Sequence, residues 1–357
     1  MRSRRIASLA MLALVAVGCS GGSSAAPDTS TSPSSSSTST SSSSTSSTST
    51  SVATSTTVEA GPVYPLTGLP AIDSAAAARP ALVVKIDNNR SARPQSGLNE
   101  ADIVFEEIVE VQTRFAAVFQ SNVADPVGPI RSGRTQDIDL LGSFNKPLFA
   151  WSGGNKNVTK AIEGSDLVSL SAQKNQVYQG GGFRRDGNRR SPHDLMADTS
   201  KLFTLAPAGS GPPPQQFQYY AGDQVRQGTP AAGVTGEMFG LAVTWTFDVT
   251  TGLYARTSGG EPHFDGLTGA LFTTDNVVVM EVVYRPSPAD VRSPEAQTIG
   301  NGTALVFTGG NVVHGTWSRP DRLSPILLTD ADGNPILLNA GRTVVELARA
   351  GNLYPVP

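Results

Sequence analysis

The sequence predicts an α/β (α+β) amino-terminal domain with a mixed sheet, at residues 58–211, and a mostly-β carboxyl-terminal domain, at residues 212–357. In the first part, short apolar runs alternate with helix-like segments, which is typical of strands and helices packed in layers. In the second part, strand-like runs are separated by Gly-rich turns. The roughly 300 residues that follow a Ser/Thr-rich leader are enough for two hydrophobic cores.

The amino terminus has the features of an export signal. Three arginines precede an apolar run at residues 6–17, which is too short for a permanent membrane-spanning helix. The run ends in Ala-Val-Gly-Cys at residues 16–19, which resembles the lipobox cut by lipoprotein signal peptidase. We therefore predict a lipoprotein signal peptide at residues 1–18 and a lipid on Cys19, the only cysteine of the chain. An ordinary secretory signal with an incidental cysteine is the alternative.

Residues 19–57 are mostly Ser and Thr, with a few Gly, Ala and Pro. Such a segment buries too little apolar surface to offset the entropy lost on ordering, so it is predicted to be a disordered tether. The folded part is then expected to be exported and held by the lipid at the outer face of the cytoplasmic membrane.

The composition excludes several functions. The chain has 27 Lys and Arg against 30 Asp and Glu, an acidic balance unlike that of a general nucleic-acid binder. His193, His263 and His314 lie far apart without metal-ligand spacing, so no metal site is expected. The sequence has neither a Walker loop nor a Gly-x-Ser-x-Gly elbow, and no cofactor is predicted.

Residues 103–109 and 113–120 predict a β-hairpin. With Val111-Gln112 as its tight connection, Val109 would face Arg114, and Glu107 would lie diagonally across from that arginine. Acidic residues at fourfold spacing, Asp102, Glu106 and Glu110, leave a helix as the alternative.

Strand, loop and helix signals recur on either side of this hairpin. Residues 82–86 are an apolar run that predicts a buried strand, and residues 127–131 predict another strand. Ser132 is then expected to be the N-cap of a helix through Leu141. Residues 148–151 followed by 152–155 repeat the same order. The loops should gather at the carboxyl ends of the strands, where ligands bind in α/β folds.

The second part contains seven strand-like runs and two turn signals. The runs are at residues 243–247, 276–284, 302–308, 312–317, 326–328, 336–338 and 343–348, and the turns are at 309–310 and 332–333. The prolines at 212–214 supply the linker.

Two groups of arginines predict an anion site. Arg131 and Arg134 flank Ser132, whose predicted helix would offer free N–H groups and a partial positive charge. The second group precedes a helix-like segment at residues 195–202 and includes Arg184, Arg185 and His193. Guanidinium groups suit bidentate pairing with phosphate or carboxylate. Each arginine can equally be a solvated or ion-paired surface residue.

A polar trio in a Gly-rich stretch of the second part is a secondary candidate. Arg256, His263 and Asp265 include a histidine with a carboxylate two residues on, a pair suited to acid–base chemistry. The alternative is a structural loop held by hydrogen bonds. His314 lies inside a strand-like run and is expected to be structural.

Longer motifs resemble a known family. The stretches ARPQSGLNEADIVFEEIVE (92–110), VGPIRSGR (127–134) and SPHDL (191–195) are similar to the amino-terminal part of the YerB-like lipoprotein family, and DGNPILLNAGRTVVEL (332–347) is similar to its second part. The resemblance covers nearly all of the chain after the tether. It implies a domain of unknown function, with no established catalytic residues to carry over. The chain departs from the family at Val111-Gln112, where a glycine pair is usual, and at Asp194, where an asparagine is usual.

Three functions remain open at this stage. The first is a tethered protein that binds an anionic cell-wall polymer or lipid-linked phosphate through Arg114, Arg131, Ser132, Arg134, Arg184, Arg185 and His193. The second is an enzyme acting on the same material, with Glu106, Glu107 or His193 as the general base; its layout resembles that of the LytR-CpsA-Psr phosphotransferases. The third is an envelope scaffold whose arginines form ion pairs with Glu106, Glu107 and Glu110.

Overall fold

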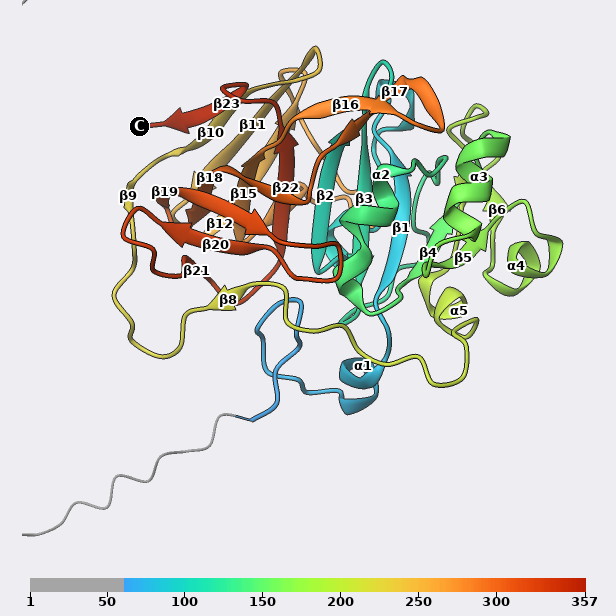
Figure 1. Cartoon of the computed structure of the whole chain (residues 1–357), viewed down its shortest axis with the longest axis horizontal. Coiled ribbons are helices and arrows are strands. Elements are labelled where there is room, and N and C mark those ends of the chain that lie inside the picture. Colours follow the sequence, from blue (N-terminus) through green and yellow to red (C-terminus); the bar gives the residue numbers. More distant parts are fainter. Residues whose placement is uncertain (1–60) are drawn as a thin grey trace, which may run out of the picture. The chain divides into compact units, whose positions relative to one another are not determined.

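The computed structural model describes residues 61–357, which form one compact unit (Figure 1). The predicted signal peptide, Cys19 and the tether lie outside the described residues. No helix within residues 61–357 has the length and apolar character needed to cross a bilayer.

A large mixed sheet runs through both halves of the sequence. Its strand order is β20-β19-β18-β15-β22-β2-β3-β1-β4-β5, with β9 paired to β19. The amino-terminal half supplies β1 (Leu82–Asp87), β2 (Ile103–Ile108), β3 (Thr113–Phe119), β4 (Leu148–Trp151) and β5 (Val168–Ser171). The carboxyl-terminal half supplies β9 (Thr229–Pro230), β15 (Asn276–Glu281), β18 (Gly300–Thr308), β19 (Asn311–Arg319), β20 (Leu327–Asp330) and β22 (Thr343–Ala348).

The two halves meet in the middle of this sheet, where β2 pairs in parallel with β22. The predicted boundary between residues 211 and 212 falls in the extended connection between α5 (Thr199–Phe203) and β8 (Gln218–Tyr219). Strands from before and after this connection are hydrogen-bonded in one sheet, and they belong to the same compact unit.

The hairpin of β2 and β3 confirms the strand prediction and rules out the helix alternative. Its register differs from the predicted one: Glu107 lies directly opposite Arg114, and Ile108 opposite Thr113. The Val109 N–H donates to the Gln112 carbonyl at 2.8 Å, so the tight connection is one residue earlier than predicted. This shift brings Arg114 and Glu107 to the same level of the sheet.

Ser132 is not a helix N-cap. The helix that follows it, α2 (Gln136–Leu140), begins four residues later, and its cap residue Thr135 makes no side-chain cap hydrogen bond. The intervening backbone is held extended, because the Arg131 N–H donates to the Lys85 carbonyl and the Arg131 carbonyl accepts from the Ser152 N–H. Residues 127–131 make isolated bridges instead of the predicted strand.

The helix-like segment at residues 195–202 also differs from the prediction. Its first two residues form β7 (Leu195–Met196), which pairs with β6 (Arg184–Arg185), and only α5 is helical. In contrast, residues 148–151 form β4 as predicted, and α3 (Lys156–Glu163) follows with Asn155 as a side-chain N-cap.

The sheet is covered on both faces. The helices α2 and α3 pack Leu140, Val158 and Ile162 against one face (Figure 1). A second sheet of order β13-β12-β11-β10-β23 places Trp245 and Tyr254 in the core on the other face. Its strands are β10 (Gly233–Met238), β11 (Leu241–Asp248), β12 (Leu253–Ser258), β13 (Glu261–Pro262), β14 (Thr273–Thr274) and β23 (Leu353–Val356). The predicted fold class, a mixed α/β first part and a mostly-β second part, is confirmed.

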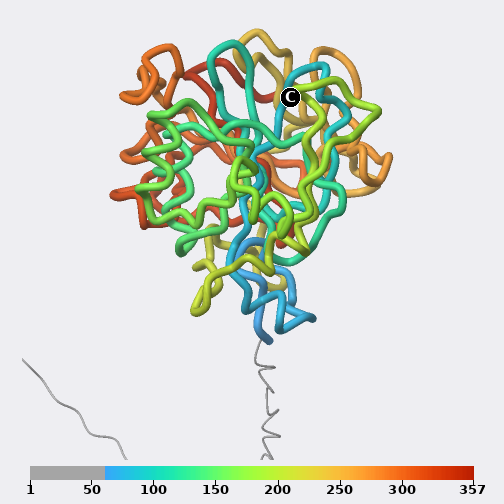
Figure 2. Tube along the Cα trace, turned by 90° about the vertical axis from the view of Figure 1, so that its right-hand side faces the viewer, coloured from blue at the N-terminus to red at the C-terminus, as the bar shows by residue number. Residues whose placement is uncertain are grey.

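The remaining elements lie at the periphery: α1 (Ser74–Ala78), α4 (Asn175–Gly180), β16 (Tyr284–Ser287), β17 (Asp290–Ala296), β21 (Leu337–Leu338) and three short 3-10 turns. The β2–β3 turn and the β16–β17 hairpin lie at the end of the body opposite to α1 and residues 61–80 (Figures 1 and 2). The carboxyl ends of β1 and β4 point to that same end, because β1 leads away from α1 and pairs with β4 in parallel.

Candidate functional site

Arg114 is a buried cation at the carboxyl end of β1. Its side chain lies on β3 opposite Asp87, the last residue of β1, and the residue is only 4% exposed. Its Nη1 donates to the Ser132 carbonyl at 2.8 Å, and no carboxylate of residues 61–357 forms an ion pair with it. Burial and the neighbouring guanidinium groups of Arg134 and Arg131 lower the pKa of Arg114 to about 10.

Asp87 joins two more of the predicted residues. Its Oδ2 lies 2.9 Å from Arg131 Nε and 2.7 Å from His193 Nδ1. The carboxylate is fully buried, whereas His193 and Arg131 are partly exposed. When Asp87 accepts a hydrogen bond from Nδ1, the neutral imidazole has its lone pair on Nε2, as in a histidine oriented by a carboxylate for proton transfer.

Arg134 completes the group and borders a pocket. Its Nη2 lies 2.7 Å from Glu110 Oε1, and its buried Nε has no hydrogen-bond partner among the described residues. The structure therefore brings Arg114, Arg131, Ser132, Arg134 and His193 to one end of the sheet, although Asp87 and Glu110 neutralise part of their charge.

The pocket beside Arg134 has a volume of about 670 Å³, and we call it the strand-end pocket. It is formed by the β2–β3 turn, Ser132 and Arg134, the loops after β4 and β5, and the β16–β17 hairpin. This is the edge at which ligands bind in parallel α/β sheets.

The loop after β4 gives the strand-end pocket a set of free backbone donors. Gly153, Gly154 and Asn155 line it, and within the described part of the chain their N–H groups donate no hydrogen bond. Gly153 has φ +99°, a conformation that favours glycine. Successive free N–H groups of this kind form concave anion sites, here at the amino end of α3.

Two predicted ligand residues lie elsewhere. Arg184 pairs with Asp125, and Arg185 Nη1 lies 2.6 Å from Asp194 Oδ1. Both arginines are exposed on β6, outside the strand-end pocket. Of the second predicted group, only His193 joins the first, through their shared contact with Asp87.

The carboxylates considered as general bases are inside the protein. Glu107 is fully buried and pairs with Lys85, which also lies 2.7 Å from Asp137. Burial lowers the pKa of Lys85 to about 8. Glu106 is equally buried and pairs with Arg256 at 2.5 Å. Neither carboxylate can meet a substrate arriving from solvent.

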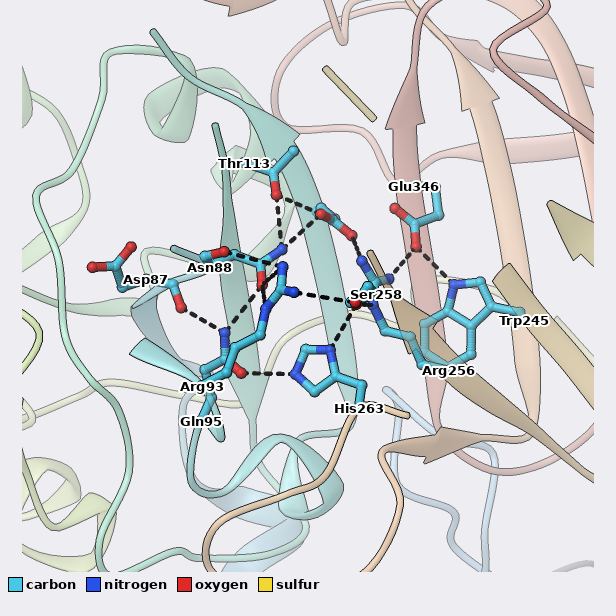
Figure 3. A network of polar contacts seen from close by, with 11 residues as sticks. Asp87, Asn88, Arg93, Gln95, Thr113, Trp245, Arg256, Ser258, His263 and Glu346 are labelled. Atoms are coloured by element: carbon cyan, nitrogen blue, oxygen red, sulfur yellow. Dashed lines mark hydrogen bonds and ion pairs between the residues drawn. The ribbon is translucent and has the colours of Figure 1, made fainter. Parts of the chain in front are cut away.

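Arg256, His263 and Asp265 do not form one catalytic trio. The Asp265 carboxylate accepts hydrogen bonds from the backbone N–H groups of Gly97 and Asn99, at 3.2 and 2.8 Å. It therefore holds the turn at residues 97–99 in place. Arg256 contacts Glu346 in the core (Figure 3), and its guanidinium also pairs with Glu106. His314 lies on β19 with its side chain exposed.

His263 belongs to a chain of hydrogen bonds in which each partner has a defined role (Figure 3). Arg256 Nε donates to Ser258 Oγ at 2.8 Å, and Ser258 Oγ lies 2.9 Å from His263 Nδ1. His263 Nε2 lies 2.7 Å from Gln95 Oε1, an acceptor, so Nε2 carries the proton. Burial, with Arg256 and Arg93 nearby, lowers the pKa of His263 well below its usual value, and the imidazole is neutral.

A second pocket lies next to this chain of hydrogen bonds, between the two halves of the sequence, and Ser258 and His263 are among its lining residues. It has a volume of about 610 Å³ and is lined by residues 88–90, 93–94 and 111–113 from the first half and by 239–241, 258–259 and 261–264 from the second. We call it the inter-half pocket. Sequence reasoning missed it, although Arg93 and Gln95 belong to the family-like stretch at 92–110. Val111 on the β2–β3 turn borders both pockets. Within residues 61–357, no cluster of His, Cys, Asp and Glu has the arrangement of a metal site.

Two models of a protein family of unknown function match this chain. The family description "Protein of unknown function (DUF3048) N-terminal domain" matches residues 66–210, and the corresponding C-terminal domain matches residues 235–345. The chain belongs to this family, and the resemblance found in the sequence is confirmed.

One relative is "Putative lipoprotein YerB" from Bacillus subtilis (strain 168), which is 28% identical over 299 residues, spanning 79% of this chain and 85% of the relative. The crystal structure of YerB protein from Bacillus subtilis has the same fold, with a TM-score of 0.71 and 24% identity. That similarity covers 83% of this chain and 100% of the YerB chain.

Proposed function

We propose that this protein is an exported lipoprotein that binds an anionic, phosphate- or carboxylate-bearing polymer of the cell envelope in the strand-end pocket. The observation that carries the proposal is the run of three free backbone N–H groups at Gly153, Gly154 and Asn155, which shares the pocket with Arg134. Such donors stabilise negative charge without a counter-ion of their own.

The charges around the pocket support an anion as the ligand. Among the lining side chains, Arg134 pairs with Glu110 and Arg292 with Asp290, so these charges balance. Arg114 adds a cation that donates to the Ser132 carbonyl, and it forms no ion pair with a carboxylate of residues 61–357. The excess positive charge therefore comes from two sources. Arg114 supplies it at the Ser132 side of the strand-end pocket, and the free N–H groups supply it from the loop after β4.

The location of the pocket favours a polymer over a membrane lipid. The β2–β3 turn and the β16–β17 hairpin, which line it, lie at the end of the body opposite to residues 61–80, where the chain enters the fold (Figures 1 and 2). A lipid-linked phosphate shares the same chemistry, and the binding experiment distinguishes the two sources.

The Arg134→Gln substitution should weaken binding of oligo(glycerol phosphate) to residues 58–357 by about tenfold or more, since a charge-assisted hydrogen bond contributes about 1.5–3 kcal/mol. Calorimetric titration measures this affinity, with glycerol as the uncharged ligand. The matched control is Arg184→Gln, which removes an arginine outside the pocket and should leave the affinity unchanged. Equal affinities of the two variants would contradict the assignment of the pocket. Tighter binding of a polyprenyl phosphate in detergent than of the oligomer would favour the lipid source.

The anchor is proposed to be a lipid on Cys19, in agreement with the name of the Bacillus relative. The Cys19→Ser variant should move from the membrane fraction to the medium, because serine has no thiol to carry the lipid. Fractionation followed by immunoblotting measures this change. Full retention of the variant on membranes would show that the anchor lies elsewhere.

Catalysis on the same ligand is a second candidate, favoured by the 2.7 Å contact between Asp87 and His193. His193 does not itself line the strand-end pocket, so its imidazole would accept a proton from a part of the ligand that extends beyond the pocket. Mass spectrometry of the oligomer after the binding incubation decides between the two. An unchanged mass supports binding alone, and cleavage or transfer products support an enzyme.

A further inference from the structure

The inter-half pocket has the composition of a small-molecule site. Its volume of about 610 Å³ lies in the range of ligand pockets, which are mostly apolar with a few fixed polar groups. Its apolar wall consists of Phe239, Leu241 and Phe264 of the second half, and Val111 of the first half is a further apolar lining residue. Phe239 is 37% exposed and Phe264 46% exposed, so these rings meet water in the hollow.

Phe239 is held on this wall in a costly backbone conformation. Its φ is +51°, in the left-handed region that non-glycine residues rarely adopt. The guanidinium of Arg349 lies 5.7 Å from its ring centroid. Phe239 and Gly240 form the two-residue turn between β10 and β11, a hairpin turn that requires positive φ at both positions, and this turn sets the Phe239 ring among the residues that line the pocket.

Arg93 supplies a cation at the floor of the pocket. Its guanidinium donates only to neutral oxygens, Asn88 Oδ1 and the carbonyls of Asn88 and Ser258, at 3.2 to 3.4 Å. No carboxylate of the described residues forms an ion pair with it, and Arg90 adds a second positive charge at the rim. Glu261 is the one acidic residue among those that line the pocket.

The core beneath Arg93 does not neutralise it. Glu106 is engaged by Arg256, and burial together with Glu106 raises the pKa of Glu346 to about 8, so Glu346 is protonated at neutral pH. With Glu346 neutral, the two positive charges of Arg93 and Arg256 face the single negative charge of Glu106. The net charge of this group is therefore +1. The hydrogen bonds from Gln95 to Asn88 Oδ1 and to the Asp87 carbonyl, at 3.1 and 2.8 Å, hold the floor in place (Figure 3).

We propose that the inter-half pocket is a second binding site, which takes a small amphipathic carboxylate: an apolar or aromatic body against Phe239 and Phe264, with its carboxylate on Arg93. The planar guanidinium matches the two oxygens of a carboxylate. An N-acylated apolar amino acid or the carboxyl end of a short apolar peptide has this chemistry. The site is independent of the strand-end pocket, and only the β2–β3 turn separates the two.

Three matched probes test the carboxylate and the apolar body separately in residues 58–357. N-acetylphenylalanine should bind, as followed by NMR titration of the amide signals that line the pocket. N-acetylphenylalanine amide, which lacks the charge, and N-acetylglycine, which lacks the ring, should each bind about tenfold or more weakly.

Two variants assign these preferences to residues. Arg93→Gln should abolish the preference for the acid over the amide, whereas Phe264→Ala should weaken both phenylalanine probes equally. Arg134→Gln should leave all three affinities unchanged, and Arg93→Gln should not alter phosphate binding, so this site and the strand-end pocket can fail separately. Thermal unfolding confirms that each variant is folded. Equal binding of acid and amide, an acid preference that survives Arg93→Gln, or no signal change at the solubility limit of the probes would each overturn the proposal.

Discussion

Replacing Arg256 with methionine should lower the free energy of unfolding by about 3–5 kcal/mol, because it leaves a buried carboxylate without its counter-ion. Arg256 is fully buried and lies 2.5 Å from Glu106 and 2.7 Å from Glu346. Its guanidinium also lies near the rings of Trp245 and Phe115, at 5.2 and 5.4 Å from their centroids. The two glutamates come from β2 and β22, so this arginine ties the second sheet to the strand pair at which the halves of the chain meet.

Urea unfolding measures the loss, and further variants attribute it to charge. The exposed Arg285→Met should change stability by less than about 0.5 kcal/mol. Adding Glu106→Gln to Arg256→Met should restore part of the loss, because the stranded carboxylate is then neutral. If Arg256→Met does not fold, Arg256→Lys keeps the charge and should retain an intermediate stability. A loss below about 1 kcal/mol for Arg256→Met would show that Glu106 does not depend on this cation.

Titration of the Glu346 carboxyl group should lower the free energy of unfolding as the pH rises from 5 to 8. The expected slope is up to about 1.4 kcal/mol per pH unit. Its Oε1 accepts from Trp245 Nε1 at 2.8 Å and from Arg256, while its Oε2 is buried without a partner. Burial and the neighbouring Glu106 raise its pKa from 4.5 to about 8. A carboxyl group whose folded pKa exceeds its unfolded pKa binds its proton more tightly in the folded state. Its stabilising contribution is complete below pH 4.5 and is lost as the pH rises towards 8.

The Glu346→Gln variant separates this effect from other titrating groups. The amide resembles the protonated carboxyl, so the variant should gain stability relative to the parent protein as the pH rises from 5 to 8. Urea unfolding at each pH measures the difference. Glu261→Gln, which alters an exposed carboxylate at the rim of the inter-half pocket, is the matched control and should run parallel to the parent. Parallel profiles for Glu346→Gln and the parent would contradict the raised pKa.

Sequence patterns a few residues long correctly predicted those helices and strands whose formation depends on residues adjacent in sequence. The apolar runs at 82–86 and 148–151 form β1 and β4, and Asn155 caps the helix after the second run. Ser132 carries the same cap signal, yet it caps no helix. Hydrogen bonds from the Arg131 backbone to Lys85 and Ser152 hold that segment extended, and these partners are distant in sequence.

The candidate site likewise combines features that local sequence predicts with features that depend on residues distant in sequence. The arginines of residues 131 and 134 could be found from the sequence, because their spacing around a Gly-rich junction is a local feature. The free N–H groups of residues 153–155 and the inter-half pocket could not, since each depends on loops brought together by the sheet. The strand β12 was also missed, because a buried arginine interrupts its apolar alternation.

By itself, the sequence determined the family, the fold class and most strands of the large sheet, because alternation, turn residues and family motifs are written within a few positions of the chain. Only the tertiary structure decided how charges combine. Glu106 and Arg256 are 150 positions apart and become partners only because β2 pairs with β22 and the second sheet closes over them. Electrostatic energy depends on distance and burial in space, and neither follows from local sequence.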